Sequence, residues 1–465
     1  MKKILTILTF SITLIGCMVG PRFRTPQIDM PAEFGSGALP SDSLAELCWW
    51  TIFPDSILHR LIMLALENNR SAEIALSRVE TARLNLGIAR SHLLPGVALN
   101  LSGQYGNLSA SAIKPENPIQ IYSTPMTISW EADIFGANRR ASEKARYELL
   151  ASEYGLRAVR LSLIAEVAHS YFSLLEYKRS LAIAQSTLAT RNTSYNLMLE
   201  SFNQGTISEL ELRQAETQRA VVATAVPKYR LAIAETAHAL SVLTGQWATD
   251  SLTTGLSLSL QSIPEEIPTG LPSQLLERRP DIMQQWALLG AANADIGIAQ
   301  AARFPTLTLT GQGGMFTRDI SNILKGESFM WQAAGSIAQP ILNFGANRKR
   351  VKITREQYRQ QVLQYEQTVL QAYSEVKDAL EQIESYKQQY IANAEIVAAA
   401  RITTYLSQKR YISGFTDYLE VLDSERDLFD AELELSTAMS NWLNAYVSLY
   451  KALGGGWITP PPPKS

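Results

Sequence analysis

The spacing of hydrophobic and polar residues changes period partway through each half of the chain. An apolar face at helical spacing extends from Ile57 to Ala82, and after Pro95 apolar residues alternate with polar ones instead. The alternation covers two runs, separated by a polar, proline-bearing stretch at 107–120 that is typical of a surface loop. The pattern therefore predicts a helix followed by a β-hairpin, with strands at about 97–106 and 121–135.

Helical periodicity then continues much further than in a globular protein. Residues 137–200 contain no proline and a single glycine, Gly155, so a helix there would be about 95 Å long. Its apolar residues recur at alternating spacings of three and four and include many alanines, which is typical of closely packed heptad helices. Glycine-containing turns at 203–206 and 413–416 predict two antiparallel helical hairpins. Pro227 is expected to break or kink the first return helix.

The same series of predicted elements occurs twice along the chain. The segment Phe135–Arg140 returns 209 residues later as Phe344–Lys349. This period is longer than that of solenoid repeats, so we infer that a whole structural unit was duplicated. The predicted organisation is repeat 1 at 55–245, a linker at 246–271, repeat 2 at 272–454 and a flexible tail at 455–465. Helices are expected at about 137–202, 206–244, 345–412 and 416–453, and the strands of repeat 2 at about 306–316 and 329–342.

The four expected strands have the alternation of membrane-spanning barrel strands. Each has apolar residues on one face and small or polar residues on the other, in runs of about ten. A soluble antiparallel sheet would give the same pattern and remains the alternative. If the sheet is in a membrane, four strands are too few to close a barrel, and open strand edges are not tolerated in lipid. The chain is then expected to associate with copies of itself.

The N-terminus has the features of an export signal. Lys2 and Lys3 precede an apolar stretch at 4–15, and Cys17 follows at the expected cleavage point. A cysteine there matches the bacterial lipoprotein signal, so we predict that 1–16 is removed and that Cys17 carries lipid at the start of an N-terminal segment at 17–54. Met18, which is not an aspartate, favours the outer membrane. An ordinary signal with a chance cysteine is the alternative.

The composition of the chain mainly excludes classes of function. The 465 residues have a formal net charge of −2 and contain no basic block, which argues against nucleic-acid binding. Apart from Cys17 the only cysteine is Cys48, so no internal disulfide framework is expected. The four histidines lack metal-ligand spacing, and no phosphate loop, dinucleotide fingerprint or nucleophile elbow is present. We therefore expect no enzyme activity, no cofactor and no bound metal.

The chain carries several distinctive motifs: the opening Cys17–Pro26, the pair Trp49–Trp50, the strand-to-helix junctions Trp130–Gly136 and Gln339–Gly345, and the internal marker Leu275–Ile282. Together these motifs resemble the outer-membrane efflux protein family (TolC-like), in its lipoprotein branch of the OprM and NodT type. The resemblance covers essentially the whole mature chain. It departs from the usual pattern at Phe23, where tyrosine is common.

This resemblance implies an α+β membrane protein that works as a homotrimer. Three protomers would form a 12-stranded outer-membrane β-barrel continuous with a 12-helix α-barrel in the periplasm, with the linker 246–271 in an equatorial belt. The implied function is the passive exit duct of a tripartite efflux system for small toxic compounds. Its partners would be outer-membrane lipid, a periplasmic adaptor protein and an inner-membrane pump of the RND type. A type I protein secretion duct and a non-conducting periplasmic lipoprotein scaffold are the alternatives.

Two groups of charged residues are candidate sites. Asp417, Glu420 and Asp423 recur every three residues beside the second turn, and the resemblance implies that they line a periplasmic gate. From spacing alone an ordinary solvated helix face is the simpler interpretation, and whether Asp417 faces the pore stays open. Arg279 and Asp281 are expected to form a structural ion pair at a helix start, where Pro280 and Asp281 suit the first turn.

Overall fold

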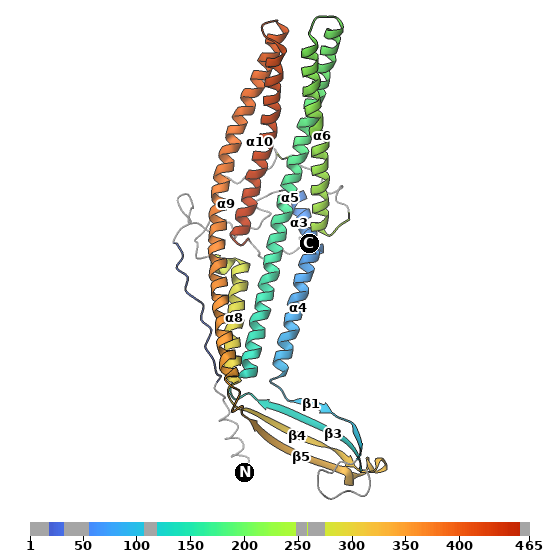
Figure 1. Ribbon diagram of the computed structural model, residues 1–465, viewed down its shortest axis with the longest axis vertical. Coiled ribbons are helices and arrows are strands. Elements are labelled where there is room, and N and C mark those ends of the chain that lie inside the picture. Colours follow the sequence, from blue (N-terminus) through green and yellow to red (C-terminus); the bar gives the residue numbers. More distant parts are fainter. Residues whose placement is uncertain (1–17, 32–54, 107–118, 248–257, 259–274, 456–465) are drawn as a thin grey trace, which may run out of the picture. The chain divides into compact units, whose positions relative to one another are not determined.

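The structure is a computed structural model that describes residues 18–31, 55–106, 119–247, 258 and 275–455 (Figure 1). The signal segment, Cys17, most of the linker and the tail from residue 456 lie outside this part. Repeat 1 contains α3 (Ser56–Asn68), α4 (Arg70–Ser91), β1 (Gly96–Leu99), β2 (Ser102–Gly106), β3 (Ile119–Ala132), α5 (Ala137–Asn203) and α6 (Glu209–Thr244). Repeat 2 contains α7 (Leu275–Arg278), α8 (Pro280–Ala301), β4 (Thr306–Thr317), η5 (Ile320–Asn322), η6 (Gly326–Ser328), β5 (Phe329–Ala338), α9 (Ala346–Ile412) and α10 (Tyr418–Ala452).

The first helix, expected to be continuous, is divided at Asn69. The backbone of Asn69 is extended, so α3 ends there, and its side-chain oxygen accepts hydrogen bonds from the N–H groups of Ser71 and Ala72. Its side-chain nitrogen donates to the carbonyl of Leu243, 2.9 Å away. An asparagine that caps one helix and is held by a distant carbonyl overrides the helical pattern, so the expectation of a single helix is wrong.

Two strands also differ from the expected bounds, in both places near a proline. The registers of β1 and β2 against β3 place Asn100 opposite Pro125. Because Pro125 has no N–H to donate, the pairing is interrupted there, and the expected first strand is split into β1 and β2. The last strand was expected to extend to residue 342, but β5 ends at Ala338, before Pro340. In contrast, α6 continues through Pro227 without a break.

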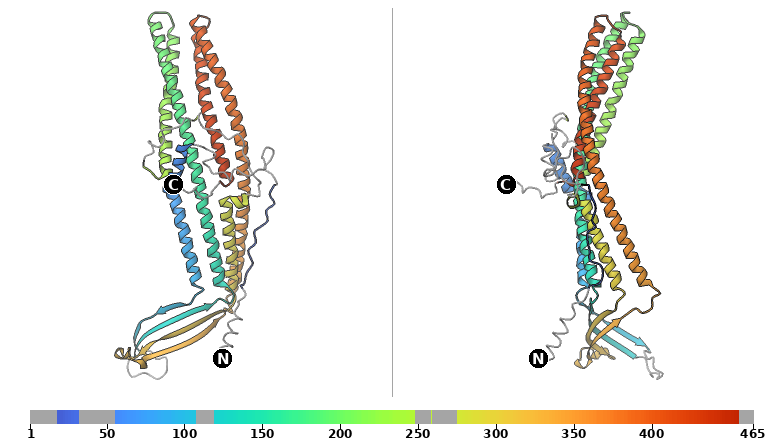
Figure 2. Two further views of the ribbon diagram at one scale, coloured as in Figure 1. Left: turned by 180° about the vertical axis from the view of Figure 1, so that it is seen from behind. Right: turned by 90° about the vertical axis from the view of Figure 1, so that its left-hand side faces the viewer.

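The strands form one antiparallel sheet (Figure 2). Their order is β1-β3-β4-β5, and β2 pairs with the same strand, β3, as β1 does. The central β3 and β4 pair in continuous register from Tyr122 with Thr317 to Ala132 with Leu307. One edge of the sheet is made by β1 and β2 and the other by β5, and all residues of β5 are exposed. Within the described residues, both edges thus keep backbone groups that no further strand pairs.

The described chain divides into two compact units. One, here called the sheet unit, comprises residues within Met1–Ile28, Ser77–Glu153 and Gln284–Glu366. The other, here called the hairpin unit, comprises residues within Asp29–Leu76, Tyr154–Met283 and Gln367–Ser465. In the part of the chain that is described, no helix combines the length and the apolar character needed to span a membrane.

In the sheet unit, residues 18–28 form an extended N-terminal strap against the first strand-to-helix junction. The N–H of Val19 donates to the carbonyl of Phe135, 3.1 Å away. The buried guanidinium of Arg140 donates to the carbonyls of Val19 and Gly20, each at 3.2 Å, and pairs with Glu143 at 2.7 Å. Gly20 has φ 112°, and a Cβ there would lie 2.6 Å from the Cα of Gly297. Only glycine fits this close approach.

Aromatic contacts extend the strap along α5 and α8. The ring of Phe23 lies 5.5 Å from that of Tyr147 and 5.7 Å from that of Trp286. The Trp286 indole donates to the hydroxyl of Thr25, and Asn293 donates to the carbonyl of Pro21. Because α5 belongs to repeat 1 and α8 to repeat 2, the strap joins the two repeats within the sheet unit.

The hairpin unit has a long apolar core along its helices. Tyr171 and Phe172 of α5, Leu240 of α6 and Leu443 of α10 are fully or almost fully buried. The Tyr171 hydroxyl donates to Asp55, 2.6 Å away, while the other carboxylate oxygen of Asp55 caps α3. Burial raises the pKa of Tyr171, and the neighbouring Asp55 adds to this effect. Tyr171 therefore stays a neutral hydrogen-bond donor.

Candidate functional site at the helical turns

Both helical hairpins end in the same kind of turn. In the first, Gly205 has φ 73°, its N–H bonds the carbonyl of Phe202, and the N–H of Thr206 bonds that of Ser201. In the second, Gly414 has φ 77° and equivalent bonds join Gly414 to Tyr411 and Phe415 to Arg410. These are Schellman motifs, which end α5 and α9 at a glycine that tolerates positive φ. The turns lie at the same end of the hairpin unit (Figure 1).

An apolar cluster joins the ends of the two hairpins. Tyr411 and Tyr418 pack with their ring centroids 5.2 Å apart. Burial and the nearby Glu425 carboxylate raise the pKa of Tyr418 to about 12, so its hydroxyl stays protonated. The buried members of the cluster are Met198, Leu212, Ala215, Tyr418, Val421 and Leu422.

Beside this cluster, an ion pair that the sequence patterns did not reveal connects α5 to α10. The guanidinium of Arg191 lies 2.6 Å from the carboxylate of Glu425, and their side chains are only 2% and 9% exposed. Gln408 of α9 donates to the other oxygen of Glu425 at 2.8 Å. Arg191 continues the three-and-four spacing of Ala184 and Leu188. A charged residue at such a core position was the one feature of the sequence that could have indicated a buried ion pair.

The three acidic gate candidates lie together at the start of α10. Asp417 is the N-cap and accepts a hydrogen bond from the N–H of Glu420 at 3.3 Å. Glu420 accepts a hydrogen bond from the Thr416 hydroxyl and lies 3.6 Å from Arg410, while Asp423 pairs with Arg426 at 3.1 Å. All three carboxylates line one open surface pocket of about 440 Å³. Asp417 thus has a capping function whether or not it also faces a pore.

The first turn carries fewer acids at the equivalent places. Ser208 caps α6, and it forms a reciprocal capping box with Glu211. Gln214 stands where repeat 2 has Asp423. The two turns therefore share their backbone geometry and differ in charge.

Arg279 and Asp281 lie away from the turns, at the start of α8. Two nitrogens of the Arg279 guanidinium bind Asp281 at 2.6 and 3.0 Å, another lies 2.7 Å from Glu375, and the same nitrogen donates to the carbonyl of Ala452. Burial works against the charge of Arg279, but the two carboxylates outweigh it and raise the pKa. Asp281 also accepts from the N–H of Ile282 in the first turn of α8.

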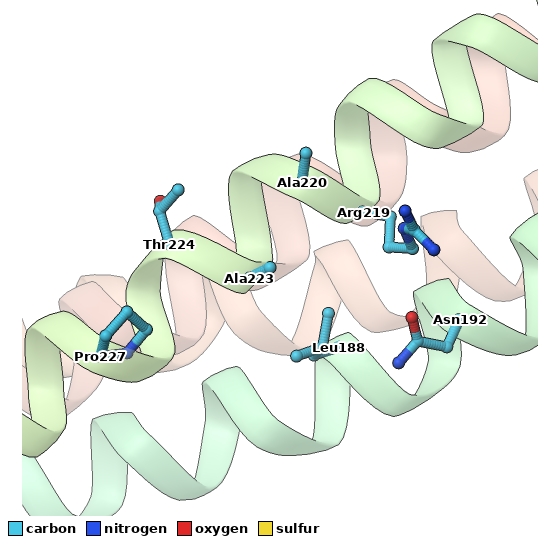
Figure 3. A pocket seen from close by; sticks show the side chains of 7 residues that line it. All are labelled: Leu188, Asn192, Arg219, Ala220, Ala223, Thr224 and Pro227. Atoms are coloured by element: carbon cyan, nitrogen blue, oxygen red, sulfur yellow. The ribbon is translucent and has the colours of Figure 1, made fainter.

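A larger open groove lies between α5 and α6 (Figure 3). Its volume is about 510 Å³, and Arg219, its one charged residue, stacks 4.4 Å from the ring centroid of Tyr195. The groove is lined by Leu188, Asn192, Arg219, Ala220, Ala223, Thr224 and Pro227.

Among the described residues, no group of three or more histidine, cysteine, aspartate and glutamate side chains could hold a metal ion.

An antiparallel sheet followed by paired, very long helical hairpins defines a class of outer-membrane channel protomers. The sequence pattern of the family described as "Outer membrane efflux protein" matches residues 61–246 and 271–455, one match in each repeat. The chain belongs to this family of channel-type efflux proteins. The family, the fold class and the role as an outer-membrane exit duct, all expected from the sequence, are confirmed by this match together with the relatives below.

The relatives match over nearly their full lengths. The chain is 32% identical over 465 residues to the "Probable efflux pump outer membrane protein TtgC" of Pseudomonas putida, covering 98% of this chain and 96% of the relative. It is 34% identical to the "Cation efflux system protein CusC" of Escherichia coli, covering 96% and 98%. The open state of the MtrE outer membrane channel of Neisseria gonorrhoeae superimposes with a TM-score of 0.86 at 31% identity, covering 95% and 98%.

Proposed function

We propose that this chain forms a homotrimeric, lipid-anchored duct that passively conducts small toxic compounds out through the outer membrane. A periplasmic adaptor and an inner-membrane pump of the RND type would deliver the compounds and supply the energy. The observation that carries the trimer is the sheet, whose β1–β2 and β5 edges are not paired by any other strand in the described part of the chain. Three copies would supply 12 strand positions, which is within the range of membrane barrels, and would close every edge.

The anchor is proposed to be lipid on Cys17. The strap supports this, because Met18 packs against Gly136, which lies between β3 and α5; a Cβ on Gly136 would lie 2.7 Å from the Met18 side chain. A terminus anchored one residue earlier is thus compatible with a membrane at the sheet. More than one acyl chain is needed for stable anchoring.

The class of substrate is proposed from the relatives. Their printed names include toluene, solvent, antibiotic and cation efflux, which together describe small toxic compounds of varied chemistry. A wide duct selects little, so we assign the choice of compound to the pump.

A strain that lacks this gene is expected to retain more of at least one small toxic compound than its parent. The compound would then accumulate because its exit path is missing. The measurement is intracellular retention across drugs, dyes and metal ions, with a complemented strain as control. Unchanged retention together with loss of a secreted polypeptide would favour the type I secretion duct instead.

The gate is proposed to be lined by Asp417, Glu420 and Asp423, which three copies would bring together as acidic rings. The variant D417N/E420Q/D423N is expected to lower the cation-over-anion permeability ratio severalfold in a planar bilayer, because charged rings set ion preference. Asparagine is as good an N-cap as aspartate, so α10 keeps its start.

The matched control removes three acids from exposed positions of α9 and has the changes E381Q/E384Q/E395Q. It is expected to keep the reversal potential of the unmodified protein. If the tip variant also keeps it, the three carboxylates form a solvated outer face and the gate assignment fails.

A further inference from the structure

The five strands of the sheet, all within the described residues, contain a single charged residue, Glu131. It stands one position before β3 ends at Ala132, at the end of the strand that continues into α5. Within the described part of the chain, its carboxylate has no ion-pair or hydrogen-bond partner. A lone, unpaired charge in a strand of a membrane protein is costly unless water reaches it.

The charges nearest to Glu131 along the chain neutralise one another. Asp133 lies 3.2 Å from the guanidinium of Arg139, and its carboxylate also accepts hydrogen bonds from the backbone N–H groups of Asn138 and Arg139. Glu131, Asp133 and Arg139 line one open pocket of about 210 Å³. With two carboxylates and one guanidinium, this pocket keeps one net negative charge, and Glu131 carries it.

The strand register places Glu131 on the polar face of the sheet. The residues on its own face in the neighbouring positions are all small or polar: Thr127, Ser129, Thr308, Thr310, Gln312 and Ser336. The opposite face carries Ile128, Trp130 and Leu309 at the same level. Successive side chains of a strand point to opposite faces, so Glu131 and Trp130 lie on different sides of the sheet.

This placement decides which way the carboxylate points in a closed barrel. Membrane barrels have apolar residues toward the lipid and polar residues toward a water-filled interior. Glu131 therefore faces the interior of the duct. The assignment depends on the alternation along β3 and on the cost of an unpaired charge in lipid, and not on the exposure of a single chain. Further copies that pair with the strand edges therefore leave the carboxylate in the interior.

The second repeat does not supply an equivalent acid. At the offset of 209 residues, Glu131 corresponds to Pro340, which follows the end of β5 at Ala338. A trimer would thus carry three such carboxylates in its 12 strands. Strands about 4.8 Å apart and tilted by about 40° give a barrel radius of about 12 Å. Because the side chain extends inward, an ion on the axis comes within about one Debye length of every carboxylate.

We propose that Glu131 is a selectivity-determining residue of the duct, which makes the β-barrel prefer cations to anions at the end that continues into the helices. The three carboxylates attract cations and repel anions in a passage whose walls otherwise carry hydroxyl and amide groups. The inference rests on the proposed trimeric duct, and it adds a charged ring separate from the acids at the helical turns.

The test measures reversal potentials of the full-length protein in a planar bilayer under a salt gradient. All variants are built on the tip variant described above, so that the acids of the helical turns no longer contribute. E131Q removes the charge at nearly constant volume. E131Q/T308E moves the charge to the residue that faces Glu131 on the adjacent strand and lies on the same face of the sheet. The control E327Q removes an exposed acid from η6, outside the strands.

E131Q is expected to lower the cation-over-anion permeability ratio about twofold in 0.1 M salt, and the difference should nearly vanish in 1 M salt, where the Debye length is about 3 Å. The variants E131Q/T308E and E327Q should keep the ratio of the tip variant. An unchanged ratio in E131Q would overturn the inference. A lowered ratio that T308E does not restore would overturn it too, because Glu131 would then act on local structure. An unmodified protein that forms no conducting pores would instead contradict the duct itself.

Discussion

Replacing Arg191 by methionine should lower the free energy of unfolding by about 3–5 kcal/mol, the usual cost of breaking a buried ion pair. The substitution keeps most of the side-chain volume but leaves the carboxylate of Glu425 buried, with the amide of Gln408 as its hydrogen-bond donor among the described residues. That uncompensated charge, more than the lost attraction, is the reason for the expected size of the effect. Chemical denaturation of the detergent-solubilised protein, followed by helical circular dichroism, measures it.

Two further variants make this prediction specific. The double variant R191M/E425M should recover much of the loss, because it removes the stranded charge and adds apolar surface to the core. The variant R213M removes an arginine from exposed pairs with Glu209 and Glu216, and should leave the free energy of unfolding nearly unchanged. If R191M is no worse than R213M, the pair does not hold α5 to α10.

The second large effect is expected for Arg140→Ala, which should detach the N-terminal strap and cost about 3 kcal/mol of stability. Arg140 is 2% exposed, so its loss leaves a cavity and removes the donors to the carbonyls of Val19 and Gly20. Limited proteolysis should then cut within residues 18–28, where the unmodified protein resists. The thermal midpoint should fall in parallel.

Arg146→Ala is the matched control on the same helix. Arg146 is exposed, so the change should leave the thermal midpoint and the protease resistance of the strap nearly unchanged. Equal proteolysis of the R140A variant and the unmodified protein would mean that the aromatic contacts of Phe23 hold the strap without Arg140. The strap would then depend on packing and not on the buried guanidinium.

Much of the architecture followed from local pattern. The absence of proline between 137 and 200 predicted a helix that the structure extends over Ala137–Asn203, and Gly205 and Gly414 marked turns that are Schellman motifs. Helices and turns depend on interactions between residues that are only a few positions apart, and the spacing of residue types in the sequence shows such interactions directly. The lipidation of Cys17 and the gate function of the acids stay predictions.

The candidate site was only partly visible in the sequence. Asp417, Glu420 and Asp423 could be selected because they are near one another in the chain, and the structure brings them to one pocket. Arg191 and Glu425 could not be paired in advance, since they are 234 positions apart and nothing in the spacing joins them. The division of the first helix at Asn69 was missed for the same reason, because its partner Leu243 is distant.

By itself the sequence determined the duplication, the long helices, their turns and the family. Each of these depends on local periodicity or on motifs that survive in both repeats. Only the tertiary structure decided which charges are buried against a partner, such as Arg140 beneath the strap, and which face solvent, such as Arg348. The two arginine motifs are almost the same in sequence. Among the residues that the structure describes, the strap covers Arg140 at the first junction and does not cover Arg348 at the second, and a local pattern carries no information about such long-range contacts.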